Sequence, residues 1–597
     1  MLSKMNFIFV TALMLSSLPL LSGAKSMHYK DGDTIPIIAN KIGPFSNPTE
    51  TYKYYDLPFC RPGQLKKQKH NMGEILSGDR KVVSAYEVKF KQDMPLQKLC
   101  KLQLSVDDVQ KFQRAVDEEY FFEMFLDDLP TWGYIGDSPT AQDLLLPDHL
   151  QEVAEQKKYI YPHLHFSIKY NGDQIIEWNA TSDRGNRLDI TSAEPTSVDF
   201  TYSVRWIQTS TSYKKRMDRY RNGRFLPATF EIHWLSIINS FVLVVLLMVF
   251  LTIILMRVLK NDFTRYMSTD EEEDLAEEET GWKLVHGDVF RFPKNKMLFT
   301  AMLGSGAQLF CMVSMLLILM LFSVVGVQRG AIQTAIIFLY ALTAGIGGYV
   351  SARFYKQLGG TNWVWNTVLC ATLFAGPFML MFIFLNSIAD YHSSTAALPI
   401  GTIAGVFALY VLVTFPLTVF GGIIGRNRAP PFEAPCRTMK VPRQIPSVPW
   451  YRHVVTQMFM AGFLPFSAIY IELHYIFASI WGHKIYTLFG ILFLAFIMLL
   501  FVTSFITVAL TYFQLASEDH RWWWRSLFYG GSTGIFVYAY CFFYYYQRSD
   551  MSGMLQTCFF FGYMLIVSYA FFMLLGTVGF FSALFFVRHI YKAIKAE

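Results

Sequence analysis

The chain has 597 residues, of which 53% are apolar and 17% aromatic but only 16% charged, and its formal net charge is +6. Because so few polar side chains cannot cover a soluble multidomain protein, this composition excludes that class and predicts a membrane protein. Residues 25–230 nevertheless resemble an ordinary soluble domain, whereas apolar blocks dominate after Trp234. We therefore expect two domains in different solvents, and no nucleic-acid partner.

Residues 1–24 have the features of a secretory signal peptide. Lys4 precedes an apolar stretch over residues 7–21, and the small residues Ser22-Gly23-Ala24 follow it, as a signal peptidase requires. The apolar stretch is shorter than the roughly 20 residues of a comfortable span, which favours cleavage near Ala24 over the alternative, an uncleaved first helix. Cleavage predicts that residues 25–230 face the lumen or the outside.

Residues 25–230 have a pattern typical of β structure. Four stretches are rich in Val, Ile, Tyr, Phe and Thr, with apolar and polar positions alternating in part: 81–91, 163–170, 173–180 and 197–208. Asn171-Gly172, between the second and third stretches, suits a type I′ turn because both residues tolerate positive φ. The stretch 104–130 has helical spacing in part and ends at Pro130. We expect a β-rich, sandwich-like antiparallel domain with a helical insertion.

Few residues of this domain point to chemistry. Cys60 and Cys100 are its only cysteines, and in an oxidising lumen we expect them to pair; the alternative is two buried free thiols. Asn179 begins its one clean glycosylation sequon. His163 and His165 share one face of a predicted strand, but no cysteine or carboxylate of matching spacing accompanies them. We expect no metal, no cofactor and no enzymatic activity.

Apolar stretches of about the length that a bilayer demands recur from Trp234 onward. The nine predicted spans are 234–256, 298–326, 331–350, 364–388, 398–425, 454–475, 486–512, 526–546 and 556–587. Together they predict a nine-helix transmembrane α bundle over residues 231–587, followed by a tail over residues 588–597.

The positions of basic residues test this arrangement independently. Loops that nine spans assign to the cytosol hold most of the Lys and Arg residues, as the positive-inside rule requires. Loops of the membrane part that are assigned to the lumen hold only Arg329, Lys484 and Arg548. The carboxyl terminus is therefore predicted to be cytosolic and the amino-terminal domain lumenal.

Several stretches of the chain, taken in order, resemble one family. They are "NPTETYKYYDLPFC" (47–60), "GEILSGDR" (73–80), "DDLPTWGYIG" (127–136), "VDFTYSVRW" (198–206), "GWKLVHGDVFRFP" (281–293), "GSGAQLF" (304–310), "PRQIPSVPWY" (442–451) and "LPFSAIYIELHYIFASIW" (464–481). Together with the signal peptide and the nine spans, this order resembles the nonaspanins, or transmembrane nine superfamily. The resemblance implies a Golgi or endosomal membrane protein that sorts, retains or helps assemble other membrane proteins, without a defined chemical activity.

The last three residues are similar to a sorting signal of that family. Lys595-Ala596-Glu597 matches its carboxyl-terminal Lys-x-Asp/Glu pattern, which the COPI coat reads. The resemblance implies that Lys595 and Glu597 bind the coat and return the protein to the Golgi. The alternative is that Arg588, Lys592 and Lys595 only anchor the last span at an anionic leaflet.

Glu472 and His474 lie toward the predicted lumenal end of the sixth span. An ionisable group at membrane depth usually faces a partner or a cavity, so both are candidate residues for binding a client helix or a proton. The alternative is that Glu472 simply reaches the membrane interface.

Three pairs of glycines have a spacing that lets helices approach closely: Gly401 with Gly405, Gly421 with Gly425, and Gly530 with Gly534. We expect most of them to pack inside the bundle.

The sequence therefore predicts a sorting or chaperone-like membrane protein, with membrane lipids, the COPI coat and transmembrane client proteins as its partners. The alternative function is a transporter or channel with a path through the nine helices, lined by Glu472. A carrier would lose its flux on Glu472→Gln, whereas a sorting receptor has no flux to lose. Few buried charges and no evident pair of broken helices argue against the transporter.

Overall fold

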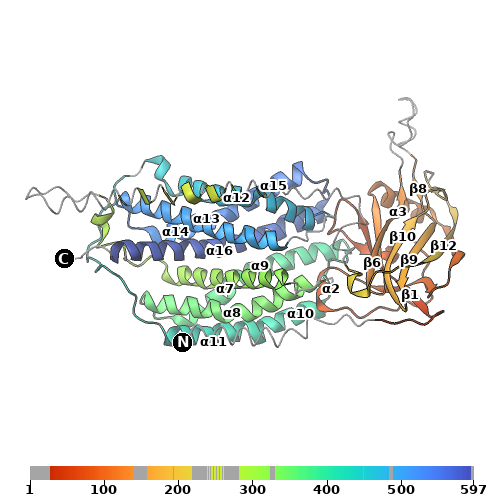
Figure 1. The fold of residues 1–597 in the computed structure, drawn as a ribbon, viewed down its shortest axis with the longest axis horizontal. Coiled ribbons are helices and arrows are strands. Elements are labelled where there is room, and N and C mark those ends of the chain that lie inside the picture. The colour runs from red at the N-terminus through yellow and green to blue at the C-terminus, as the bar shows by residue number, and fades with distance from the viewer. Residues whose placement is uncertain are drawn as a thin grey trace, which may run out of the picture.

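A computed structural model of the chain describes residues 27–138, 157–192, 194–217, 281–322, 330–447, 449–482 and 489–592, together with scattered residues between 238 and 260. A β domain, formed by residues before 218, lies at one end of a bundle of long helices (Figure 1). We call the end of the helices that contacts the β domain the near end and the opposite one the far end. The predicted signal peptide and the predicted sorting signal lie outside the described residues.

The first sheet of the β domain is antiparallel. It runs in the order β2, β1, β5, β6, and β3 also pairs with β1. Its strands are β1 (Thr34–Pro44), β2 (Tyr52–Lys53), β3 (Val82–Lys89), β5 (Tyr120–Leu126) and β6 (Leu129–Tyr134). The strand predicted at 81–91 is confirmed.

The second sheet has the order β10, β9, β12, β4 and contains the other three predicted strands. They are β9 (His163–Asn171), β10 (Gln174–Ser182) and β12 (Thr196–Gln208), with β4 (Met94–Leu104) at the edge. Strands β9 and β12 are parallel, so the prediction of a wholly antiparallel domain is wrong at this pair. A third, small sheet joins β7 (Gly136–Asp137), β8 (Tyr159–Ile160) and β11 (Leu188–Asp189).

The hairpin between β9 and β10 forms as predicted, but its turn is shifted by one residue. Asn171 pairs with Gln174, so the two turn residues are Gly172 and Asp173, and of these only Gly172 has a positive φ, of 62°. Glycine at the first central position is the requirement of a type II′ turn. The type I′ pattern instead joins β5 to β6, where Asp127 and Asp128 have φ values of 49° and 63°.

The predicted helix over 104–130 is shorter than its spacing indicated. Helix α3 (Val106–Asp117) begins at Ser105, whose hydroxyl accepts a hydrogen bond from the Asp108 N–H at 3.3 Å. After Asp117 the chain turns into β5 and β6, because β5 pairs with β1 and buries Phe122 and Phe125. Pairing with a neighbouring strand overrides local helical spacing here.

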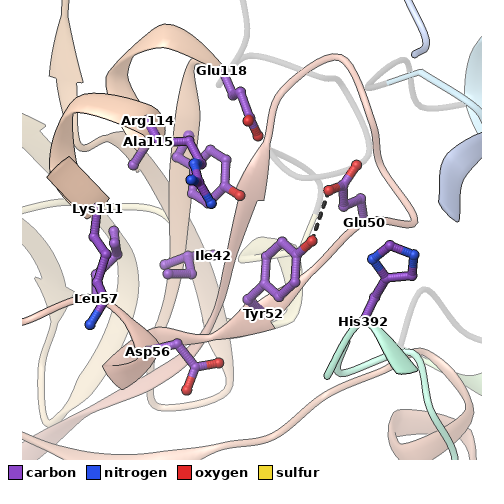
Figure 2. A pocket seen from close by; sticks show the side chains of 11 residues that line it. Ile42, Glu50, Tyr52, Asp56, Leu57, Lys111, Arg114, Ala115, Glu118 and His392 are labelled. Carbon is purple, nitrogen blue, oxygen red and sulfur yellow. Dashed lines mark hydrogen bonds between the residues drawn. The ribbon is translucent and has the colours of Figure 1, made fainter. Parts of the chain in front are cut away.

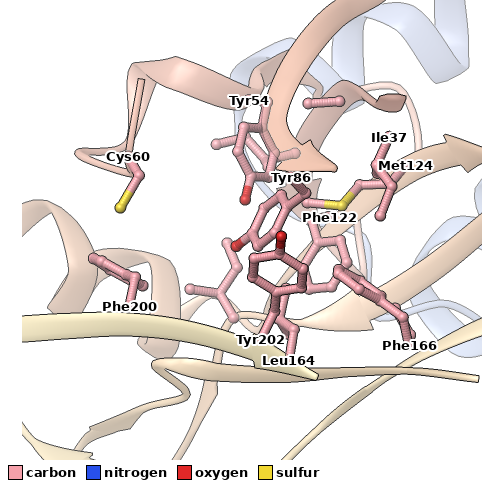
Figure 3. Close-up of a cluster of buried hydrophobic side chains, with 14 of the residues drawn as sticks. Ile37, Tyr54, Cys60, Tyr86, Phe122, Met124, Leu164, Phe166, Phe200 and Tyr202 are labelled. Carbon is pink, nitrogen blue, oxygen red and sulfur yellow. The ribbon is translucent and has the colours of Figure 1, made fainter. Parts of the chain in front are cut away.

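The two larger sheets face one another across an aromatic core (Figure 3). Phe122 and Met124 from the first sheet and Phe166 and Tyr202 from the second are all at most 6% exposed. Tyr86 crosses between the sheets, with its ring 5.4 Å from those of both Phe166 and Tyr202. The fold is therefore the predicted sandwich.

The structure joins Cys60 to Cys100 in a disulfide, with their Cα atoms 6.0 Å apart. Cys100 lies in β4, and Cys60 follows the segment that begins at β2. The bond thus fastens the stretch 52–60 to the second sheet.

Seven helices are long and apolar enough to cross a membrane among the described residues. They are α7 (Lys296–Leu321), α8 (Ala331–Gln357), α9 (Trp363–Tyr391), the run Ile400–Asn427, α12 (Val454–Ile480), α13 (Phe489–Ala516) and α16 (Met554–Lys592). The run Ile400–Asn427 comprises α10 (Ile400–Leu409), a π-helical turn (Tyr410–Thr414) and α11 (Phe415–Asn427).

Two of the nine predicted spans differ from these seven helices. The span predicted at 526–546 consists of two shorter helices, α14 (Trp522–Gly531) and α15 (Thr533–Gln547), which meet at Ser532. The span predicted at 234–256 is described only at scattered helical residues. The count of nine therefore stays a prediction.

The three glycine pairs have different surroundings. Gly421 and Gly425 in α11 lie against the backbone of α8, and Gly530 and Gly534 lie against α16. A Cβ atom added at Gly401 or Gly405 in α10 would meet nothing within 4 Å among the described residues. Two of the pairs thus serve internal packing, and the third faces outward.

Candidate functional site: the junction of the two domains

Segment 47–51 of the β domain is hydrogen-bonded to the loop that follows α9. The carbonyl oxygen of Thr51 accepts hydrogen bonds from the Thr395 N–H at 2.8 Å and from the Ser394 hydroxyl at 2.9 Å. The hydroxyl groups of Thr51 and Thr395 are themselves 2.6 Å apart. All three residues are at most 5% exposed, so these polar groups satisfy one another away from solvent.

The same segment contacts the start of α16. Asn47 accepts a hydrogen bond from the Ser552 N–H at 3.0 Å through its side-chain oxygen. The side-chain oxygen of Gln556, which is fully buried, accepts hydrogen bonds from both the N–H, at 3.1 Å, and the hydroxyl of Thr49. Helix α16 therefore begins on the β domain.

Helix α2 (Met72–Leu76) forms the second contact. Asn71 caps it, since its side-chain oxygen accepts the Glu74 N–H at 2.8 Å while the Glu74 carboxylate accepts the Asn71 N–H at 2.9 Å. Gly73 lies so close to the start of α8 that an added Cβ would be 2.1 Å from the Gly330 carbonyl oxygen. Only glycine allows this approach.

Arg80, four residues beyond α2, also bonds to the helical domain: its guanidinium donates to the Ala397 carbonyl at 2.6 Å. Asn40 accepts the Arg80 N–H at 2.8 Å and donates to the carboxylates of Asp79 and Glu123 at 3.0 and 2.8 Å. A buried polar network thus holds this corner of the β domain at the near end.

Glu74 and Lys81 form an ion pair beside α2, with 2.7 Å between Oε1 and Nζ and side chains only 17% and 7% exposed. Burial alone would raise the pKa of Glu74. The hydrogen bond from Lys81, the Asn71 N–H and the charges of Lys81 and His70 outweigh burial and hold that pKa below its usual range. A carboxylate with a lowered pKa stabilises the fold above its unfolded pKa of about 4.3, and this contribution is lost as the pH falls through the folded value.

We expect Glu74→Gln to destabilise the β domain by about 1–2 kcal/mol between pH 5 and pH 7.5, because it removes a charged hydrogen bond in a mostly buried place. The difference from the unmodified protein should shrink below about pH 4, where Glu74 itself takes up a proton. Thermal unfolding of the full chain over this pH range measures the effect. Asp199→Asn, which breaks an exposed pair with Lys98, is the control and should change little; an equal loss for both variants would contradict the assignment.

A pocket of about 400 Å³ lies at the junction, beside segment 47–51 (Figure 2). Its wall from the β domain comes from β1, β5, α3 and the segment 50–57, and His392, after α9, completes it. The lining residues are Ile42, Glu50, Tyr52, Asp56, Leu57, Lys111, Arg114, Ala115, Glu118, Tyr120 and His392. The two domains thus share a cavity lined by charged, polar and apolar side chains.

The predicted intramembrane residues Glu472 and His474 lie in α12, and neither takes part in the junction hydrogen bonds described above. Glu472 is 7% exposed, and its Oε2 has no hydrogen-bond partner among the described residues. Nδ1 of His474 lies 3.1 Å from the hydroxyl of Tyr540 in α15. His474 thus contacts a tyrosine hydroxyl, and no group of three or more His, Cys, Asp or Glu side chains that could hold a metal occurs in the part of the chain that the structure describes.

The remaining predicted residues of the β domain lie in the second sheet. Asn179 is half-buried in β10, where its Oδ1 accepts a hydrogen bond from Thr131 at 3.4 Å, and its glycosylation stays a prediction. His163 and His165 share one partner, the hydroxyl of Ser203, at 3.0 and 2.9 Å. Strand β12 therefore supplies a hydrogen-bond partner to both histidine rings.

At the far end, residues 281–293 cover the last turns of α16, and we call them the cap segment. The hydroxyl of Tyr591 donates to the Trp282 carbonyl at 2.7 Å, and the Trp522 indole donates to the Val289 carbonyl at 2.8 Å. Asp288, which is 3% exposed, accepts hydrogen bonds from the Arg291 side chain and the Arg443 N–H. Helix α16 is thus held by hydrogen bonds near both ends, and Lys592, its last described residue, lies three positions before Lys595.

Sequence reasoning singled out the stretches 47–60, 73–80 and 281–293 only for their resemblance to a family. In the structure, the first two form the junction and the third forms the cap segment. The partners of these motifs lie hundreds of residues away, and no local pattern identifies them.

Comparison with known proteins gives consistent results. A model of the family described as endomembrane protein 70 matches residues 51–554. The chain is 53% identical over 583 residues to transmembrane 9 superfamily member 4 of Arabidopsis thaliana, covering 97% of this chain and 96% of that one. It is 47% identical over 581 residues to transmembrane 9 superfamily member 1 of Mus musculus (96% and 94%) and 48% identical over 592 residues to putative phagocytic receptor 1b of Dictyostelium discoideum (99% of each). No solved structure matches significantly.

Proposed function

Because this chain belongs to the transmembrane 9 superfamily, the endomembrane protein 70 family, we propose that it sorts and retains other membrane proteins in the Golgi or endosomes. It is a multi-pass membrane protein, and none of the three relatives' names states an enzymatic activity. In this proposal the β domain is lumenal, the carboxyl terminus is cytosolic, and the COPI coat binds Lys595 and Glu597.

The course of α16 is the observation that supports this proposal most. This one helix of 39 residues begins at the junction and ends under the cap segment, so the carboxyl terminus follows from the end of the bundle opposite the β domain. A client held on the lumenal side and a coat bound on the cytosolic side would then be connected through the same helix, α16. The chain would return with its client to the compartment from which both came.

The proposal predicts that Lys595→Ser moves the protein out of the Golgi or endosomes to the cell surface or the lysosome. Residues 268–280 are rich in Asp and Glu and lie in a predicted cytosolic loop. An epitope inserted there leaves the carboxyl terminus free, and microscopy measures the distribution. Because a charged hydrogen bond contributes about 1.5–3 kcal/mol, coat binding by a tail peptide should weaken about tenfold or more.

Lys592→Ser is the matched control, because it removes the same charge from an exposed position inside α16. It should leave the distribution unchanged. Unaltered localisation of the Lys595 variant, or equal displacement of both variants, would show that these lysines act as a membrane anchor and not as a signal.

A transporter remains the second candidate function, and Glu472 is the observation that favours it. A carboxylate 7% exposed within α12, with one oxygen lacking a partner among the described residues, is costly at membrane depth. Such a group is typical of ion and proton paths as well as of contacts between helices.

A further inference from the structure

The pocket at the junction is lined by charged groups of both signs over an apolar floor. Glu50, Asp56 and Glu118 supply carboxylates, Arg114 and Lys111 supply cationic groups, and the buried Ile42, Leu57 and Ala115 form the apolar part. In Figure 2, Glu50 and Tyr52 are hydrogen-bonded at one end of the pocket, and Lys111 lies at the other. Carboxylates and cationic groups therefore both line the cavity, with Asp56 lying away from Glu50.

The position of Glu50 is fixed before any ligand arrives. Tyr52 donates its hydroxyl to Glu50 Oε1 at 2.8 Å, and Asn47 donates its amide to Oε2 at 2.8 Å. Asn47 is held in turn by the Ser552 N–H. Each carboxylate oxygen can accept two hydrogen bonds and accepts one here, so both retain acceptor capacity. Because this carboxylate is already immobilised, little further side-chain entropy is lost when it binds a cation.

No ion pair joins the charged groups of the pocket to one another among the described residues, although the charge of Arg114 acts on Glu118. No ion pair within 4.0 Å joins Glu50, Glu118 or Arg114 to any other described residue. The Glu118 side chain is accessible to solvent, yet its partial desolvation and the nearby charge of Glu50 raise its pKa against the opposing effects of Tyr120 and Arg114. A cation between the two carboxylates would relieve this repulsion.

We propose that this pocket binds a lysine or arginine side chain of an extended polypeptide, with the cation between Glu50 and Glu118 and an acidic side chain or carbonyl oxygen of the same segment on Arg114. The apolar floor takes the aliphatic part of the basic side chain. His392 stands at the near end of the helices, so the segment recognised is the one that directly follows or precedes a client's span. The inference rests on the proposed function and names the part of the client that is bound.

The residues present favour this ligand over two others. A metal ion needs several ligands, and the described residues contain no group of three or more His, Cys, Asp or Glu that could hold one. A zwitterionic lipid head group has the same two charges as the peptide but brings no aliphatic side chain to the apolar floor. The lipid head group is therefore tested against the peptide directly.

The experiment uses the purified full chain in detergent and a short acetylated peptide that contains Arg-Asp. A second peptide has Gln in place of Arg, and glycerophosphoethanolamine stands for the lipid head group. Calorimetric titration should give a Kd below about 1 mM for the Arg peptide and binding about tenfold weaker or more for the Gln peptide. Glu118→Gln should weaken binding of the Arg peptide to a similar extent.

Glu119→Gln is the matched control, because Glu119 is the next residue, is exposed and does not line the pocket. It should bind the Arg peptide like the unmodified chain, and both variants should melt at an unchanged temperature because both side chains are exposed. Equal binding of the Arg and Gln peptides, equal loss for both variants, or no binding at all would overturn the proposal. Glycerophosphoethanolamine binding as tightly as the Arg peptide, with the same dependence on Glu118, would overturn the polypeptide as ligand.

Failure of this inference and failure of the proposed function give different results. If the pocket binds no peptide but Lys595→Ser still displaces the protein, retrieval stands and the client is held elsewhere. If the peptide binds and the Lys595 variant stays in place, the pocket is a binding site and the tail is not the signal.

Discussion

Gly421→Ala is expected to destabilise the helical domain by about 3 kcal/mol or more, because the new Cβ atom would lie 1.9 Å from the Gly345 carbonyl oxygen in α8. Overpacking a well-filled interior costs about 1–3 kcal/mol where side chains can move aside. Here the obstacle is backbone, so the two helices must separate. The close contact between α8 and α11 extends over several turns. A Cβ atom at Gly425 would approach the Tyr349 carbonyl, and one at Gly348 would approach the Thr418 carbonyl. Thermal unfolding of the purified chain in detergent measures the loss.

Gly401→Ala provides the control within the same membrane-spanning run. Its Cβ would meet nothing within 4 Å among the described residues, and alanine has a higher helix propensity than glycine by about 1 kcal/mol. This variant should melt at the same temperature as the unmodified chain or slightly above it. Similar losses in both variants would mean that α8 and α11 are not in direct backbone contact.

Replacing Cys60 and Cys100 together by serine is expected to cost the β domain about 4 kcal/mol. The bond spans a sequence separation of 40, and the chain-entropy model gives about this value for a loop of that length. Much of the stability of an ordinary domain, about 5–15 kcal/mol in total, would be lost. Limited proteolysis of the full chain at rising temperature should show the β domain cleaved first, and reductant should reproduce the effect in the unmodified protein.

Cys558→Ser serves as the comparison for that double variant. Cys558 is a free, half-buried cysteine in α16, so its replacement breaks no covalent bond. Resistance of its β domain to proteolysis should be unchanged. If the double cysteine variant resisted equally well, the disulfide would not contribute to the stability of the domain.

The strands of the β domain could be predicted from the sequence because their apolar residues alternate and face one core. The errors arose where a distant partner decides the structure. Residues 120–126 have part of a helical spacing, yet they form β5 because β1 lies beside them. The turn after β9 was placed one residue early because the pairing of Asn171 with Gln174 depends on the register between two strands.

The candidate site was harder to predict. Sequence reasoning chose Glu472 because a charge in an apolar stretch is conspicuous, and the structure places this residue in α12, nearly fully buried. The junction was not predicted, because no sequence pattern marks Thr51 or Thr395. Only the fold brings their hydroxyls together. The pocket was missed for the same reason, since Glu50, Glu118 and His392 come from three separate parts of the chain.

Helix α16 has a mechanical consequence. Its 39 residues extend about 58 Å at 1.5 Å per residue, nearly twice the hydrocarbon thickness of a bilayer. Both ends are hydrogen-bonded, to Thr49 and to Trp282. If such a rod tilted by about 10°, its ends would shift sideways by about 10 Å relative to one another. A force on the β domain and a force on the carboxyl terminus therefore act on opposite ends of the same helix.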